Sequence, residues 1–207
     1  MGHAVYDMTT RDRLCKLFCD TQSLKKAPTG GPLFKLSGGG ESPYYVNCRR
    51  LLGDSAGVGH ACRAMYASIR YGLPEGTSNF YVGGTGNAGN RLVGGILNHA
   101  FHHMTSCQGF HVLDQAKTYG VKEQLTGIIG VEGPIFMVED VITTGGSIAR
   151  AAHTVLDQGF RIHSIHALVD RGEGGVKALE DSLGVPVLTM LTMSELFAFM
   201  EEYTGKR

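Results

Sequence analysis

Short apolar runs alternate along the chain with stretches in which apolar residues recur every three or four positions. The runs of strand length lie at residues 80–82, 110–113, 135–138, 162–169 and 185–191. Such unbroken runs are typical of strands that are buried on both faces of a parallel sheet. The segments 92–104 and 148–159, which follow two of the runs, carry apolar residues at helical spacing. The alternation predicts an α/β fold with a mostly parallel sheet flanked by helices.

The first 50 residues or so do not follow this alternation. A helix is expected near the N-terminus, and residues 27–32, Ala-Pro-Thr-Gly-Gly-Pro, read as a turn. The chain has 207 residues, 43% hydrophobic and 18% charged, which suits one globular domain with a substantial core. We therefore expect a single domain over residues 1–207, with a helix and a small accessory unit over about 1–50 and the α/β core over about 51–207.

A run of hydroxyl-bearing and glycine residues, Thr143 to Ser147, joins the apolar strand at 135–138 to the helical stretch that starts at Ile148. The N-terminus of a helix carries unpaired N–H groups and the positive end of the helix dipole, and both favour an anion. Gly145 and Gly146 leave room for a phosphate to approach the backbone, and the three hydroxyls add donors. The turn is therefore a candidate phosphate site.

Two adjacent acids, Glu139 and Asp140, follow the apolar run at 135–138 and are expected at the carboxyl edge of the sheet, where ligands bind in such folds. Carboxylates repel a phosphate but suit the 2′ and 3′ hydroxyls of a ribose. Any Mg²⁺ would be held through the oxygens of the ligand rather than by a dedicated protein cage. The structural alternative is a capped turn beside an acid pair that faces water.

A second glycine-rich turn, residues 83–90, follows the first apolar run. Four glycines in eight residues allow a close approach of the backbone, and the helix that follows offers another N-terminus to an anion. A tight connection between strand and helix would have a similar sequence, so the glycines alone do not indicate an anion site. The position of the turn ahead of the acid pair is what favours that interpretation.

The segment from Ile135 to Ser147 resembles the phosphoribosyl pyrophosphate (PRPP) signature of type I phosphoribosyltransferases. Ser-Pro-Tyr-Tyr-Val-Asn at 42–47 and Leu-Val-Asp-Arg-Gly-Glu-Gly-Gly at 168–175 are similar to the two motifs that distinguish the orotate phosphoribosyltransferases. The order and spacing of these motifs match from about Phe34 to Leu196.

This resemblance implies a type I phosphoribosyltransferase fold, in which a small N-terminal hood covers the base. It implies a glycosyltransferase of pyrimidine biosynthesis, which transfers phosphoribosyl from PRPP to orotate with Mg²⁺ and gives orotidine 5′-phosphate and pyrophosphate. It also implies a homodimer, in which a mobile catalytic loop from each subunit closes over the site of the other.

The resemblance assigns residues to each part of the site. PRPP 5′-phosphate and ribose binding falls to Glu139, Asp140, Thr143, Thr144, Gly145, Gly146 and Ser147. The pyrophosphate loop comprises Gly84, Thr85, Gly86, Asn87, Ala88 and Gly89. Orotate binding falls to Arg171, Tyr44, Tyr45 and Lys35, and the catalytic residues are Lys117, Asp140 and Glu139. A planar guanidinium such as that of Arg171 suits the carboxylate and carbonyl edge of orotate.

The chain departs from the family pattern at the catalytic loop. Lys117 matches the central lysine of the loop, but Leu113 and Asp114 stand where the family has an Arg-Lys pair, and Tyr119 stands where it has a histidine. These cations neutralise the departing pyrophosphate in the family, so their loss predicts reduced activity. Two alternatives to orotate transfer follow: a catalytically weak or silent paralogue that binds PRPP or a nucleotide, and a transferase for a different base.

Two smaller departures concern single cations. Ser37 stands where the family has a lysine, and Lys35, two residues earlier, lies on the same face of an extended strand and is expected to replace it. Ala88 stands where some relatives have a lysine in the pyrophosphate loop.

Charge and cysteine content exclude several other classes of protein. Nineteen basic and nineteen acidic residues give a formal net charge of zero, which argues against a nucleic-acid or anionic-membrane partner. The sequence shows no signal peptide and no apolar run near the length of a membrane span, so a cytoplasmic location is expected. The odd count of five cysteines argues against a disulfide framework. His99 and His103 have metal-ligand spacing, but no third ligand is evident.

Overall fold

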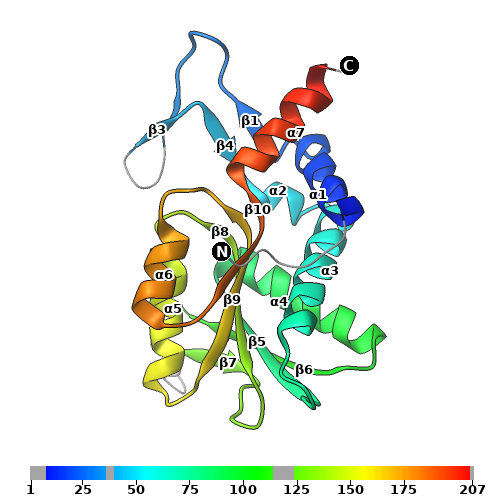
Figure 1. Cartoon of the computed structure of the whole chain (residues 1–207), viewed down its shortest axis with the longest axis vertical. Coiled ribbons are helices and arrows are strands. Elements are labelled where there is room, and N and C mark those ends of the chain that lie inside the picture. The colour runs from blue at the N-terminus through cyan, green and yellow to red at the C-terminus, as the bar shows by residue number, and fades with distance from the viewer. Residues whose placement is uncertain (1–7, 36–39, 114–123, 206–207) are drawn as a thin grey trace.

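The computed structural model describes residues 8–35, 40–113 and 124–205. Within these ranges, six strands form one sheet in the order β10-β9-β8-β5-β6-β7 (Figure 1). The strands are β5 (Asn79–Thr85), β6 (Ser106–Val112), β7 (Leu125–Gly127), β8 (Ile135–Ile142), β9 (Ile162–Asp170) and β10 (Val187–Thr192). Every neighbouring pair is parallel except β6 and β7. The predicted α/β fold with a mostly parallel sheet is confirmed.

Helices cover both faces of the sheet (Figure 1). One face packs against α3 (Ser55–Gly72) and α4 (Gly86–His102), and the other against α5 (Gly146–Asp157) and α6 (Gly175–Leu183). The first and last helices, α1 (Met8–Asp20) and α7 (Met193–Gly205), pack against each other, and α1 also packs against α3.

Several predicted boundaries are wrong by a few residues. The run at 110–113 is the end of β6, which begins at Ser106, because the polar first half of that strand gives no apolar signal. The helix predicted over 92–104 is α4, which begins at Gly86 and ends at His102, and Met104 beyond it has a positive φ of 50°. The run at 135–138 continues through the acid pair to Ile142.

The first 50 residues contribute short strands that lie beyond the carboxyl edge of the sheet, beside α7 (Figure 1). Among the described residues, β1 (Leu24–Lys26) pairs with β4 (Tyr44–Val46), and β2 (Phe34–Lys35) pairs with β3 (Glu41–Ser42), both antiparallel. The short helix α2 (Cys48–Leu51) then leads back toward the core. We call these four strands the hood.

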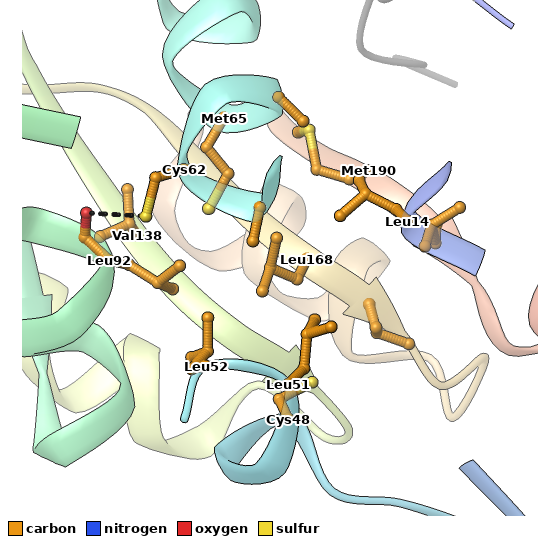
Figure 2. Close-up of a cluster of buried hydrophobic side chains, with 14 of the residues drawn as sticks. Leu14, Cys48, Leu51, Leu52, Cys62, Met65, Leu92, Val138, Leu168 and Met190 are labelled. Atoms are coloured by element: carbon orange, nitrogen blue, oxygen red, sulfur yellow. Dashed lines mark hydrogen bonds between the residues drawn. The ribbon is translucent and has the colours of Figure 1, made fainter. Parts of the chain in front are cut away.

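The hydrophobic core on the α3 and α4 face of the sheet also includes residues of α2, the helix that follows the hood. Figure 2 shows Leu51 of α2 and Leu14 of α1 in the same buried cluster as Met65 of α3, Leu92 of α4 and Val138 of β8. The two covering helices lie close together, because a Cβ built on Gly95 would lie 2.2 Å from Cys62 Sγ. Cys62 Sγ also donates to the carbonyl of Leu92 at 3.7 Å. Helix α2, which connects the hood to the rest of the chain, is therefore packed into the core.

One histidine of the sheet is fully buried. His166 of β9 is 1% exposed, with Nδ1 3.0 Å from Ser68 Oγ of α3 and Nε2 2.9 Å from Ser164 Oγ. Burial, with a smaller contribution from His163, lowers the pKa of His166 from 6.5 to about 3. A neutral, doubly hydrogen-bonded ring thus joins α3 to the sheet.

We expect the buried His166 to make the protein sensitive to acid. Above pH 6.5 neither the folded nor the unfolded state protonates it, whereas between pH 6.5 and 3 only the unfolded state does. Stability should therefore fall as the pH drops, by up to about 1.4 kcal/mol per pH unit from this group. Urea unfolding of the parent and of His166→Gln between pH 7 and 5 should show a shallower pH slope in the variant. The exposed His153→Gln is the control, and parallel slopes in all three proteins would contradict the assignment.

Candidate active site at the carboxyl edge of the sheet

The acid pair lies within β8 rather than after it, because the strand continues to Ile142. Glu139 is 6% exposed, and its Oε1 accepts from the backbone N–H of Asp140 at 3.0 Å. Asp140 is half-buried, and its Oδ1 accepts from the N–H of Val141 at 3.0 Å. Asp140 lines a cavity of about 460 Å³ under the hood. Glu139 is buried and does not line this cavity, so the two predicted ribose ligands differ in access.

The candidate phosphate site, Thr143 to Ser147, lies at the start of α5 as predicted, and we call it the phosphate turn. Gly145 is the N-cap residue, with a φ of +79°, and a Cβ there would lie 2.9 Å from Leu179 Cγ. No side chain caps α5 in the described chain, so its first N–H groups are open to an anion. The hydroxyl of Thr144 faces a cavity of about 510 Å³, while Ser147 faces another of about 370 Å³.

Arg150 stands over the same turn and was missed by the sequence reasoning. Its Nη1 lies 3.5 Å from the point where a Cβ on Gly146 would be, and Arg150 shares the 370 Å³ cavity with Ser147 and Thr85. Arg150 is the fifth residue of α5, and its side chain reaches back to the first turn of the helix. Among the described residues no ion pair of Arg150 is formed. The available signal was a basic residue four positions after Gly146.

The predicted pyrophosphate loop is not a loop. Gly84 and Thr85 end β5, and Gly86, with a φ of +63°, begins α4 directly. Thr85 is buried and donates to the carbonyl of Val112 at 3.3 Å. Ala88 and Gly89 are buried in the helix, and a Cβ on Gly84 would lie 2.9 Å from the backbone of Gly89. The remaining member, Asn87, is exposed. The glycines allow a tight passage from strand to helix, and pyrophosphate binding by this segment stays a prediction.

Arg171 follows β9 and lies between two cavities. It lines both the 510 Å³ cavity and the 460 Å³ cavity, and its side chain is only 13% exposed. Its Nη2 lies 3.0 Å from Glu173 Oε1, so Arg171 also forms an ion pair. A mostly buried guanidinium that faces open space is suited to a carboxylate ligand.

The residues predicted for orotate do not share one cavity. Tyr44 lines the 510 Å³ cavity with Arg171, whereas Tyr45 and Lys35 line the 460 Å³ cavity with Asp140. Successive side chains of a strand point to opposite faces, which separates Tyr44 from Tyr45. Arg171 alone among the four predicted residues faces both spaces.

These cavities are also lined by residues that were not predicted, among them Arg49, Met193 and Phe197. Arg49 lines the cavity of Asp140, and Met193 and Phe197 of α7 line the cavity of Tyr44. For Arg49, its place directly after the hood motif was a usable signal. For Met193 and Phe197 there was none, because they lie about 150 residues from the hood in sequence.

The connections after β8 and β9 are joined by two main-chain hydrogen bonds. The N–H of Arg171 donates to the carbonyl of Ile142 at 2.9 Å, and the N–H of Gly175 donates to that of Thr143 at 3.1 Å. A Cβ on Gly175 would lie 2.2 Å from Thr143 O, so only glycine permits this contact. The phosphate turn and the Arg171 segment therefore form one unit.

The predicted catalytic residue Lys117 lies outside the described residues, as do Asp114 and Tyr119. Leu113, at the start of that segment, lines the cavity that holds Arg150. Across residues 8–35, 40–113 and 124–205, no three His, Cys, Asp or Glu side chains gather as metal ligands. No helix in these ranges has the length and apolar character needed to cross a membrane.

Comparisons with known proteins agree with this geometry, although no protein-family model matches the chain. The orotate phosphoribosyltransferase of Aquifex aeolicus is 30% identical over 189 residues, which are 91% of this chain and 98% of the relative. That of Thermococcus gammatolerans is 31% identical over 173 residues, 84% of this chain and 87% of the relative.

A solved structure has the same fold. Orotate phosphoribosyltransferase of Mycobacterium tuberculosis, in complex with PRPP, superposes with a TM-score of 0.67 at 22% identity and covers 90% of this chain and 98% of its own. On the strength of the sequence relatives, the chain belongs to the orotate phosphoribosyltransferase family.

Proposed function

We propose that the protein transfers the phosphoribosyl group of PRPP to orotate and releases pyrophosphate, giving orotidine 5′-phosphate. The observation that carries the proposal is the unit formed by the phosphate turn and the Arg171 segment, which brings an anion site and a carboxylate-binding guanidinium together under the hood. The relatives named orotate phosphoribosyltransferase support it, as does the M. tuberculosis structure, which is a complex with PRPP.

The 5′-phosphate of PRPP would lie on the first turn of α5. The open N–H groups of Gly146 and Ser147 and the hydroxyls of Thr143, Thr144 and Ser147 supply donors there. Arg150 adds a full positive charge beside the same turn. Asp140, which faces the adjoining cavity, would accept hydrogen bonds from the ribose hydroxyls, and Glu139 behind it adds negative charge near the sugar.

The base would lie on the other side of the turn, in the cavity that Tyr44 and Arg171 line. The carboxylate of orotate can pair with the Arg171 guanidinium, and its ring with aromatic surface. In the reaction a bond forms between the base nitrogen and ribose C1 while the bond from C1 to pyrophosphate breaks. The proton of the base nitrogen leaves in the same reaction and can pass to an oxygen of the departing pyrophosphate. Positive charge develops on the ribose, so the two acids stabilise the transition state as well as the ground state.

Asp140, together with oxygens of the ligand, would hold Mg²⁺, because carboxylate and phosphate oxygens are hard donors of the kind that Mg²⁺ prefers. The ion would supply positive charge to the leaving group. Lys117 would add charge on the protein side. The rest of the rate enhancement comes from holding both reactants in line.

A second candidate function follows from the sequence of the catalytic loop. Leu113, Asp114 and Tyr119 replace three cations of the family pattern, which favours a weak or silent PRPP-binding paralogue, or a transferase for another base, over a fast enzyme. One assay separates these functions: pyrophosphate release from PRPP with and without orotate, each with and without Mg²⁺. Release that requires both orotate and Mg²⁺ supports the proposal. Binding of PRPP without release for any base supports the silent paralogue.

We also propose that the protein is a cytoplasmic homodimer in which Lys117 serves the site of the partner subunit. A C2 dimer would place each loop over the other site. Sedimentation equilibrium should give twice the 22.2 kDa mass of the chain. Mixing Lys117→Ala chains with Arg171→Ala chains should restore activity, because the mixed dimer keeps one intact site. A monomer, or a mixture without activity, would contradict this arrangement.

A further inference from the structure

Helix α7 presents one face to the hood. Met193, Phe197 and Glu201 follow one another at intervals of four residues, so they lie along one side of the helix. Met193 and Phe197 line the 510 Å³ cavity, and Glu201 reaches Lys26 of the hood strand β1, with Oε1 2.7 Å from Nζ. The last helix of the chain is therefore part of the wall around the base cavity.

Tyr44 makes two contacts that involve α7, one directly with Phe197 and one through Lys26, which pairs with Glu201. The ring of Phe197 stacks on that of Tyr44, with centroids 3.6 Å apart and planes inclined by 26°. Lys26 is the register partner of Tyr44 in the hood, and its Nζ lies 5.8 Å from the centroid of the Tyr44 ring. Because Glu201 holds Lys26, both contacts depend on α7.

The close stack limits where a base can lie. Rings 3.6 Å apart are in van der Waals contact, so a planar base does not fit between Tyr44 and Phe197. The open space lies instead between this ring pair and Arg171, with Thr144 of the phosphate turn on its border. A base in this space meets aromatic surface on one side and the guanidinium on the other.

We propose that Phe197 is a positioning residue for the base: it fixes the Tyr44 ring and, with Met193, forms the wall against which a planar aromatic base with a carboxylate lies. This inference rests on the proposed function and extends it to a helix that no motif marks. Phe197 contributes to recognition of the base and leaves recognition of the phosphoribosyl group unchanged, because it lines neither the cavity of Asp140 nor that of Ser147 and Arg150.

The test compares Phe197→Leu with Phe199→Leu. Phe199 lies two residues further on, stacks on Tyr203 and is also partly buried, but does not line the cavity. Loss of the aromatic stack should raise the KM for orotate about tenfold in Phe197→Leu. The KM for PRPP should stay within about twofold, and Phe197→Tyr should restore the KM for orotate. Phe199→Leu should leave both KM values near those of the parent.

Three results would overturn the inference. The first is an unchanged KM for orotate in Phe197→Leu. The second is an equal rise of both KM values in Phe197→Leu, accompanied by a lower Tm, since that pattern indicates general loosening. The third is an equal effect of Phe199→Leu. If Phe197→Leu does not fold, Phe197→Met takes its place in the same comparison.

Failure of the proposed function is a distinct outcome. A parent protein without orotate-dependent turnover refutes the transfer reaction, and calorimetry then decides the role of Phe197. Phe197→Leu should bind orotidine 5′-phosphate about tenfold more weakly than the parent does, with ribose 5-phosphate binding unchanged. Equal binding of orotidine 5′-phosphate by parent and variant would overturn the inference by itself.

Discussion

Replacing Glu139 by Gln and Asp140 by Asn together is expected to lower orotate-dependent turnover by a factor of about 100 or more. Each acid can make charge-assisted hydrogen bonds, worth roughly 1.5–3 kcal/mol apiece, and about 1.4 kcal/mol corresponds to tenfold in rate. The loss should fall mainly on turnover, because the charge on the ribose grows toward the transition state. Steady-state kinetics at saturating PRPP and orotate, with Tm from calorimetry, measure both effects.

The single variants should differ, since only Asp140 faces the cavity. Asp140→Asn should lose activity at an unchanged Tm, whereas Glu139→Gln changes a buried side chain bonded to the backbone and should alter the Tm as well. Glu132→Gln, which neutralises an exposed acid just before β8, is the matched control. A double variant that fails to fold would show that the pair is structural.

Restoring the family cations should raise turnover by about tenfold or more. The triple variant Leu113→Arg, Asp114→Lys, Tyr119→His adds charge where pyrophosphate leaves, and one regained charge-assisted contact alone accounts for that factor. The contacts act on a charge that develops in the transition state, so affinity for PRPP should change less than turnover. The measurement is steady-state kinetics of parent and triple variant at saturating Mg²⁺.

The interpretation of this comparison depends on the turnover of the parent protein. A parent as fast as the triple variant would show that other cations replace those of the loop, and Arg49, which lines the cavity of Asp140, is a residue the structure offers for this role. Two inactive proteins that still bind PRPP would favour the silent paralogue.

The buried part of the fold was predictable from sequence because its signals are local. Parallel strands buried on both faces, such as β9, leave unbroken apolar runs, and α5 repeats its apolar residues at helical spacing. Boundaries were less predictable. The first half of β6 has no apolar run that would indicate a strand. In β8 the two adjacent acids suggested that the strand ends before them, but it continues to Ile142. The hood strands are two or three residues long, too short for any periodicity.

The part of the candidate site that lies within one continuous segment of the sequence was predictable. The turn from Thr143 to Ser147 contains its own glycines, hydroxyls and helix start, so its place in the structure agrees with the prediction. The cavity walls were not predictable in this way. Phe197 meets Tyr44 only because the chain folds α7 against the hood, and the separation of Lys35 from the cavity of Tyr44 depends on side-chain direction in strands of two and three residues.

The two main-chain hydrogen bonds between the connections after β8 and β9 fix the distance between the proposed phosphate site and Arg171. Gly175 admits no side chain that could widen this distance. If the proposed sites are right, the protein selects ligands by the separation of their phosphate and carboxylate groups. We then expect a compound with the same phosphate and base, but a longer or shorter sugar, to engage only one of the two sites.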